Sequence, residues 1–340
     1  MHRASVKLAL SLVALLSTSC DSCRTSGRTA AKEDLQLVPK ETDIIMMVNL
    51  ARARGTALWQ RVLEARDSNV DAKRDYEDFA KKCALDPLRQ IDSVFVALPQ
   101  GSAESHDFVL ILRGAFDENK LVECAKEQAK KQGSEVIATD YTDKKLYNDT
   151  KQGQAYATFL DKKTVALGSL DWVKKVVDLS ANKAAASAKD NEGLATLMKR
   201  TKTGAAMWGA GLVPPSVRDQ LASNPQLSAA GSMKTVSGSV EVASGLDAAL
   251  DIDLGSDNDA KELVAKITAQ LLDARKQPQV LMMGLVPLFD GIKIEQKAAA
   301  FHLTLKFTQP QVDDLINRFK GLLKGLAGGG APSGLPEIAK

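Results

Sequence analysis

Three histidines, His2, His106 and His302, are the only imidazoles that this sequence offers for catalysis or metal binding. Neither His106 nor His302 has a Cys, Asp or Glu at the spacing of a metal site. The sequence contains no Gly-x-Ser-x-Gly, no phosphate-binding loop and no His-Glu-x-x-His. A Ser/His/Asp site can assemble from residues far apart in a chain, but no pattern here indicates one. We therefore predict that the protein is not an enzyme and holds no cofactor.

An acidic cluster has part of the spacing of a calcium loop. Five side chains take places 1, 3, 7, 9 and 12 of such a loop: Asp251, Asp253, Asp257, Asp259 and Glu262. Place 5 is Gly255, which has no side-chain ligand, and place 6 is Ser256, where the motif needs glycine. The alternative fits better: Asp251 and Asp253 lie on the solvated face of a strand, and Ser256 or Asp257 caps the following helix.

Two of the four cysteines, Cys83 and Cys124, lie on the apolar faces of predicted helices. Cys83 follows Tyr76 and Phe79 at helical spacing, and Cys124 shares a face with Leu121. In an oxidising compartment, two such cysteines in the same half of the chain predict a disulfide between Cys83 and Cys124. The alternative is two separate buried thiols that pack as small apolar residues.

The amino terminus has the organisation of a secretory signal. Residues 1–7 are basic, Leu8 to Leu16 are apolar, and three small residues lead to Cys20. The cysteine at the cleavage point makes the segment resemble a bacterial lipoprotein signal with Leu16 to Cys20 as its lipobox, although Ser17 stands where that family usually has Leu. The resemblance implies that residues 1–19 are removed and that Cys20 is acylated. The alternative is a chance cysteine after an ordinary signal peptide.

Composition is that of a folded globular protein with 44% hydrophobic residues. Without the signal, the chain has 43 basic and 42 acidic residues. This near-zero net charge does not indicate nucleic-acid binding. After the signal, the best candidate for a membrane span is Val280 to Phe289, which is too short and contains Pro287. We expect attachment to the inner or outer membrane through the lipid alone, with the protein facing the periplasm or the exterior.

The chain divides into five predicted parts: the signal peptide (1–19), a flexible lipid-attached tether (20–36), a first repeat (37–185), a second repeat (200–324) and a Gly-rich disordered tail (325–340). Each repeat opens with a strand and a helix, continues with a hairpin and closes with a helix. The most similar segments of the two repeats are Leu112 to Val122 and Leu254 to Val264. In each, a strand ends near a glycine, Gly114 or Gly255, and a helix with an acidic first turn follows.

This pattern predicts an α+β fold of antiparallel sheets with helices packed on one face, as two tandem lobes or as one long sheet that both repeats share. It resembles uncharacterised bacterial lipoproteins with two copies of a domain of unknown function, in which an opening like Val38 to Asp43 precedes a strand and an aromatic helix. The resemblance implies no activity.

Two functions remain open. The first is a structural or protein-interaction role in the cell envelope, with an envelope protein as partner. The second is a carrier of a lipid or another apolar ligand. Apolar stretches such as Ile44 to Val48 and Val280 to Phe289 suit a ligand cavity and equally suit an ordinary core.

Overall fold

A computed structural model of the chain describes residues 32–99, 107–151, 155–182, 185–223 and 228–327. Alternating apolar residues form strands in nearly all the predicted segments. The strands are β1 (Thr42–Asn49), β2 (Ile91–Pro99), β3 (Val109–Gly114), β4 (Val136–Tyr141), β5 (Lys144–Asp149), β6 (Tyr156–Asp161), β7 (Thr164–Gly168), β8 (Met207–Leu212), β9 (Thr235–Glu241), β10 (Gly245–Asp253), β11 (Ile292–Lys297) and β12 (Ala300–Thr308).

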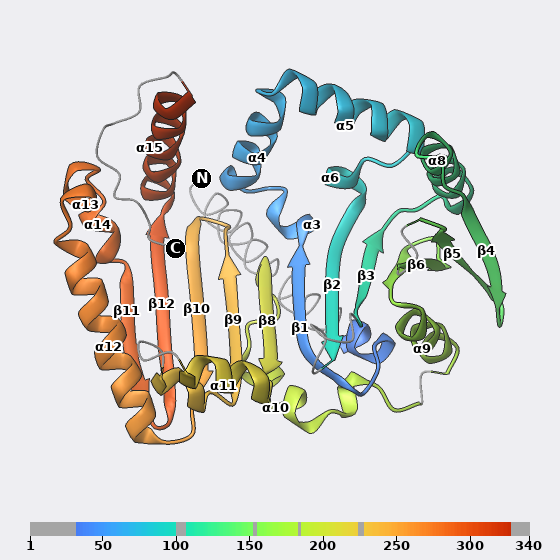
Figure 1. Cartoon of the computed structure of the whole chain (residues 1–340). Coiled ribbons are helices and arrows are strands. Elements are labelled where there is room, and N and C mark those ends of the chain that lie inside the picture. The colour runs from blue at the N-terminus through green and yellow to red at the C-terminus, as the bar shows by residue number, and fades with distance from the viewer. Residues whose placement is uncertain (1–31, 100–106, 152–154, 183–184, 224–227, 328–340) are drawn as a thin grey trace, which may run out of the picture.

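Helices connect these strands (Figure 1). They are α3 (Leu50–Ala53), α4 (Ala57–Asp67), α5 (Val70–Cys83), α6 (Pro87–Gln90), α8 (Glu118–Lys131), α9 (Leu170–Ala181), α10 (Glu192–Arg200), α11 (Pro215–Ser223), α12 (Asp257–Arg275), α13 (Pro278–Met282), α14 (Val286–Phe289) and α15 (Gln309–Ala327), with short 3₁₀ turns η1 (Ala188–Asp190) and η2 (Ser228–Ser232). Most begin at a capping side chain: Thr56 accepts from the amide of Trp59, and Asp117 accepts from that of Lys120.

The described strands form one antiparallel sheet in the order β11-β12-β10-β9-β8-β1-β2-β3-β7-β6-β5-β4. The α+β class with an antiparallel sheet is therefore confirmed, in the form of one long sheet shared by both halves. The two halves join where β1 pairs with β8, from Ile44 opposite Gly211 to Val48 opposite Met207. Outward from this pair, each side continues with a hairpin, β2–β3 or β9–β10, and then with the last strand of its half, β7 or β12.

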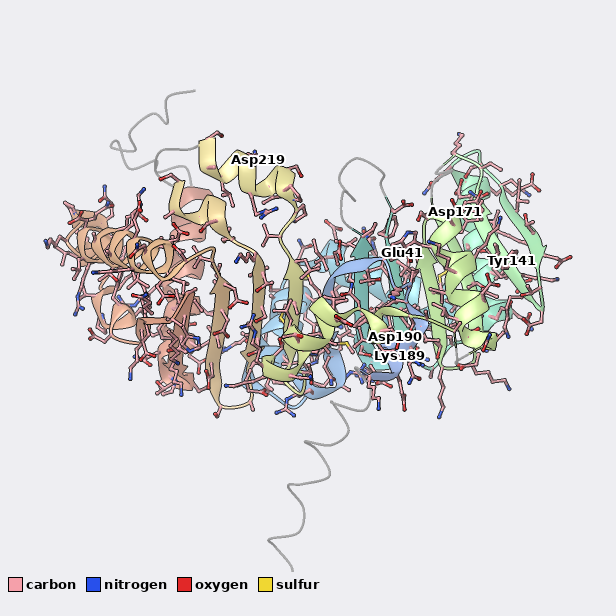
Figure 2. All side chains as sticks on the ribbon, turned by 90° about the horizontal axis from the view of Figure 1, so that it is seen from below. Glu41, Tyr141, Asp171, Lys189, Asp190 and Asp219 are labelled. Atoms are coloured by element: carbon pink, nitrogen blue, oxygen red, sulfur yellow. A yellow bond between two sulfur atoms is a disulfide. The ribbon has the colours of Figure 1, made fainter. Side chains whose placement is uncertain are left out.

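The two main apolar cores lie on opposite faces of the shared sheet. One core packs Ile45, Phe95 and Trp208 against α9 and α10. The other packs Ile252 and Phe301, which point to the opposite face, against η2 and α12. Figure 2 shows this arrangement, with Lys189 and Asp190 before α10 on one side of the strands and Asp219 of α11 on the other. Each half thus has its main helices on one face, and the covered face changes along the sheet.

Two segments differ from the expected boundaries. Residues 32–37, expected in the tether, form a helix, because Leu35, Leu37 and the following Val38 are buried in the first core. The apolar run Val280 to Phe289, whose composition predicts one apolar helix from Gln279 to Phe289, forms two short helices. Gly284 has a φ of +62°, which ends α13, and Pro287 suits the first turn of α14. Cys20 and most of the predicted tail lie outside the described residues.

Candidate functional site

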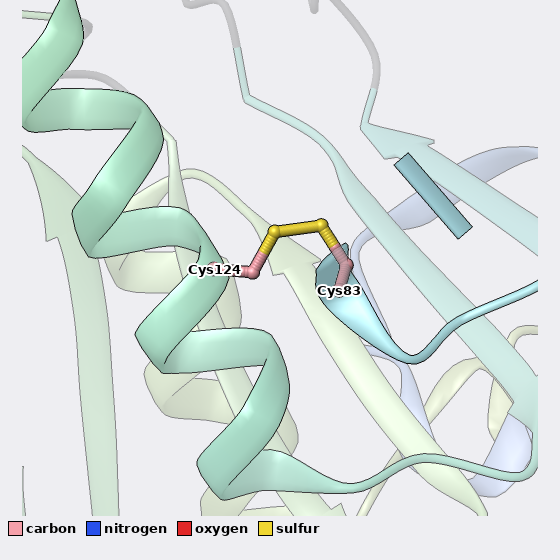
Figure 3. The surroundings of a disulfide bond; sticks show 2 residues. All are labelled: Cys83 and Cys124. Carbon is pink, nitrogen blue, oxygen red and sulfur yellow. A yellow bond between two sulfur atoms is a disulfide. The ribbon is translucent and has the colours of Figure 1, made fainter. Parts of the chain in front are cut away.

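The cysteine pair joins two helices of the first half. Cys83 is the last residue of α5, and Cys124 lies in α8 (Figure 3). Their Cα atoms are 5.0 Å apart, and the two sulfur atoms form a disulfide. Both residues are nearly inaccessible, with 2% and 6% of their surface exposed. Cys20, Cys23, His2 and His106 lie outside the described residues.

The five acidic residues of the candidate calcium loop do not come together. Asp251 bonds to His302, and Asp253 forms an ion pair with Arg200 and accepts from Thr235. The hydrogen bond from Arg200 is the main reason that the pKa of Asp253 is lowered. Ser256 caps α12 by accepting from the amide of Asp259. Among the described residues, no group of three or more His, Cys, Asp or Glu side chains could hold a metal ion.

A polar row crosses four strands in the second half. Ser237, Asp251, His302 and Glu295 are successive cross-strand partners, so their side chains point to the same face. In a nucleophilic triad, the imidazole lies between the hydroxyl and the carboxylate. Here the carboxylate of Asp251 lies between Ser237 and His302, which is the wrong order for His302 to take a proton from Ser237.

A cavity of about 430 Å³ lies beside the helix of residues 32–37, and its lining is mostly polar. Arg113 contributes to that lining, but its guanidinium is already bonded: Nε and Nη2 donate to Asp34 Oδ1 at 2.9 and 2.7 Å, and Nη1 donates to Thr164. Lys144, which also lines the cavity, pairs with Asp143 at 3.4 Å. These cations are therefore already paired, which leaves them poorly placed to bind an anionic ligand.

The opposite face of the central strands carries an apolar surface instead. Register places the following side chains and glycines together on this face, which we call the open apolar face: Met46, Val48, Val94, Val96, Leu110, Met207, Gly209, Gly238 and Val240. Met46 is 45% exposed and Met207 46% exposed. In Figure 1, which is seen from this side, no helix crosses in front of the middle of β8, β1 and β2.

Two glycines make a shallow strip in the middle of this face. Gly209 and Gly238 are cross-strand partners on β8 and β9. A Cβ added at Gly209 would lie 3.3 Å from the carbonyl oxygen of Ile45, and one added at Gly238 would lie 2.9 Å from the carbonyl oxygen of Ala249, so a larger residue at either position would force its neighbours to shift. The close approach of the strands therefore favours glycine here, and a glycine inside a strand can also mark a place where another molecule approaches closely.

Sequence patterns gave only a partial signal for this face. Ile44 to Val48 is apolar at every position, which is typical of a strand covered on both faces. The structure covers Ile45 and Met47 but leaves Met46 half exposed. Which face stays open depends on where the helices of each half pack, and this is a long-range property that strand periodicity does not report.

Comparisons with known proteins identify no family. No family model matches the chain, and no curated protein matches it. Among solved structures, crystal form III of TP0453 has a TM-score of 0.45 and 12% sequence identity, covering 84% of this chain and 97% of that one. Crystal form I of TP0453 has a TM-score of 0.41 and 10% identity, with 85% and 96% coverage.

Proposed function

We propose that this protein is a lipid-anchored protein of the cell envelope that binds another envelope protein through the open apolar face. The observation that carries the proposal is the contrast between two faces of the sheet. In the second half, the face opposite α12 carries the polar row of Ser237, Asp251, His302 and Glu295, in which Ser237 is buried. On the central strands, the open apolar face leaves Met46 and Met207 about half exposed.

A contiguous exposed apolar surface is uncommon on a soluble monomer and typically marks an interaction site. Single exposed apolar residues need no explanation. Here, however, the two methionines are diagonal neighbours on paired strands, because Met46 lies opposite Gly209 and Val48 lies opposite Met207. Methionine adapts its shape to a partner because its side chain is unbranched and polarisable. These features support a protein partner with an apolar surface segment of its own.

The shape of the surface favours a macromolecule over an enclosed small ligand. Small-molecule sites are concave and bury most of their ligand. The two described cavities of note lie elsewhere: one beside Glu33 and Arg113, and one of about 280 Å³ beside Gly245 and Thr308. The open apolar face is wide and has no helix over its middle (Figure 1).

Substitution of Met46 tests this proposal. A lysine there places a charge in the middle of the face, and burying a methionine contributes about 1.5–3 kcal/mol, so Met46→Lys should weaken partner binding tenfold or more. The matched control is Met282→Lys on α13, where the native side chain is 81% exposed. A photo-crosslinker at position 46 should trap the partner in intact cells, and one at position 282 should not. Equal crosslinking from both positions would contradict the proposal.

The second candidate function is a carrier of an apolar ligand. Helices α4 and α5 lie beside the open apolar face and could cover a small ligand there, which favours this function. Native mass spectrometry of protein purified without detergent distinguishes the two functions. A stoichiometric small apolar ligand that is lost in Met46→Lys would favour the carrier. A co-purified envelope protein that is lost in the same variant favours the interaction role.

The lipid anchor has its own test. We expect mass spectrometry of the membrane-extracted protein to find an acylated peptide that begins at Cys20, and Cys20→Ala to release the protein from the membrane fraction. Within the described residues, no helix is long and apolar enough to cross a membrane. An unmodified Cys20 in the mature protein would refute the anchor but would leave the binding face untouched.

A further inference from the structure

The shared sheet ends in two unlike edges. β11 forms one edge and β4 the other, and no described strand pairs with the outer side of either one (Figure 1). Charged side chains, lysine above all, protect an edge against the addition of another strand. On β11 such side chains stand at alternate positions: Lys293, Glu295 and Lys297. The middle of β4 is exposed and uncharged instead, with Ile137, Ala138 and Thr139. The β4 edge is therefore the one that is open to a further strand.

Alternate residues of β4 direct their backbone groups outward. The amide of Thr150 donates to the carbonyl oxygen of Glu135 at 2.9 Å, so the backbone of Glu135 faces β5. Because this direction alternates along a strand, the outward-facing residues are Val136, Ala138 and Asp140. Antiparallel pairing of two β4 strands about Ala138 uses all of them, since Val136 then lies opposite Asp140 of the second copy. This register gives about six hydrogen bonds between the copies and places no acid opposite another acid.

Two charges without ion-pair partners lie near opposite ends of this strand. Glu135, directly before β4, is exposed and forms no ion pair with another described residue. Lys174 of α9 lies 5.4 Å from the centroid of the ring of Tyr141, the last residue of β4, and it too has no ion pair within the described part of the chain. Asp178, an acid beside them, already accepts a hydrogen bond from the Tyr141 hydroxyl at 3.0 Å. The ammonium of Lys174 is therefore available to a carboxylate from another molecule.

The same register brings these charges together. Glu135 stands six residues before Tyr141, so both side chains point to the face on which α9 packs. Pairing about Ala138 places Glu135 of each copy directly opposite Tyr141 of the other, with their Cβ atoms about 5 Å apart. Lys174 then lies within reach of that carboxylate, and the twofold symmetry forms the contact twice. Ile137, which is 46% exposed, becomes a diagonal neighbour of the same residue in the second copy.

We propose that β4 is a self-association site, at which a second copy of this chain adds its own β4 and extends the sheet across a twofold axis. The strand is complementary to itself in backbone hydrogen bonds and in charge. An interface of one short strand per copy is small, so association should be weak, with a dissociation constant of the order of 10–100 µM. The open apolar face lies on the central strands and takes no part in this pairing, so the site does not depend on the proposed function.

An exchange of charge between copies tests the register. Sedimentation velocity of the wild-type protein from about 5 to about 500 µM, at about 50 mM salt, should show a monomer–dimer equilibrium. Glu135→Lys and Lys174→Glu should each weaken the dimer about tenfold or more, because either homodimer then contains like-charge contacts. An equimolar mixture of the two variants should regain the wild-type affinity, since both contacts are attractive in the mixed dimer. Regained affinity also shows that both variants are folded.

Two control variants separate this site from other surfaces. Glu295→Lys makes the same change on the opposite edge strand and Met46→Lys alters the open apolar face, and both should leave the dimer unchanged. Ala138→Pro removes an outward-facing N–H and no bond to β5, so it should abolish the dimer. A wild-type protein that stays monomeric at the highest concentration, or a mixture that does not regain affinity, would overturn the proposal. Loss of the dimer in Met46→Lys would assign self-association to the open apolar face instead. Failure of the proposed function is read separately, as partner crosslinking that Met46→Lys does not affect.

Discussion

Asp34 shows how a single buried carboxylate affects the whole protein. Only 1% of its surface is exposed, and burial raises its pKa to about 6 from 3.8, although Arg113 opposes the rise. Because the pKa is higher in the folded state, the folded protein binds this proton more tightly than the unfolded chain does. The free energy of unfolding contributed by Asp34 should therefore rise as pH falls from about 7 to about 4, by up to about 3 kcal/mol.

Urea unfolding of the wild type and of Asp34→Asn, carried out between pH 4 and 8, measures this contribution to the free energy of unfolding. The variant should be the more stable protein near neutral pH, and the difference should shrink as the pH falls. Glu123→Gln, which removes an exposed carboxylate on α8, should retain the wild-type dependence. A difference that grows on acidification would mean that the attraction of Arg113 outweighs burial.

At the residue scale, sequence spacing identified pairs better than it identified sites. Helical periodicity placed Cys83 and Cys124 on inward faces, and the structure joins them. In the acidic cluster, Gly255 and Ser256 depart from the calcium-loop pattern, and Ser256 takes the capping role that the alternative interpretation offered for it or for Asp257. The partners of Asp251 and Asp253, His302 and Arg200, lie about fifty residues away in the chain, a distance that local spacing does not bridge.

At the scale of elements, Gly114 and Gly255, which hold matching positions in the two predicted repeats, have different surroundings. A Cβ at Gly114, the end of β3, would lie 2.2 Å from the carbonyl oxygen of Gln90. At Gly255 the nearest atoms, Asp259 Oδ2 and Ser232 Cβ, would be 3.2 and 3.3 Å away. Gly114→Ala should therefore destabilise the protein by about 1–3 kcal/mol, and Gly255→Ala by less than about 1 kcal/mol. Thermal unfolding of both variants decides this, and equal effects would contradict it.

Local patterns predicted most elements because strand alternation and helix periodicity are local properties. They did not predict the break inside Val280 to Phe289, where the left-handed Gly284 and Pro287 override a continuous apolar run. They also did not predict the pairing of β1 with β8, since Met46 and Gly209 are far apart in the chain and meet only in the folded sheet.

At the scale of the whole molecule, the shared sheet determines what a cut between the predicted repeats should do. Residues 181, 182 and 186 are exposed, whereas Ser187 and Ala188 are buried, and Ala188 donates to the carbonyl oxygen of Val38. Limited proteolysis should therefore cleave within residues 181–186. The two fragments should still elute together on a sizing column, because Trp208 packs in the same core as Ile45 and Phe95.

The matched control is the same digest run in urea just below the unfolding midpoint, where the fragments should separate. Separation under native conditions would mean that the β1–β8 joint is too weak to hold the halves together. Cleavage inside α8 in preference to residues 181–186 would contradict the predicted boundary.

The position of β1 also decides how the molecule carries mechanical load. A pull on the chain ahead of residue 32 first meets the bonds between Asp34 and Arg113 and then acts along β1, which is hydrogen-bonded to β2 on one side and β8 on the other. Load along a strand with neighbours on both sides shears many hydrogen bonds at once, whereas an edge strand such as β11 or β4 can be peeled one bond at a time. The amino-terminal segment therefore enters the sheet at one of its most force-resistant positions.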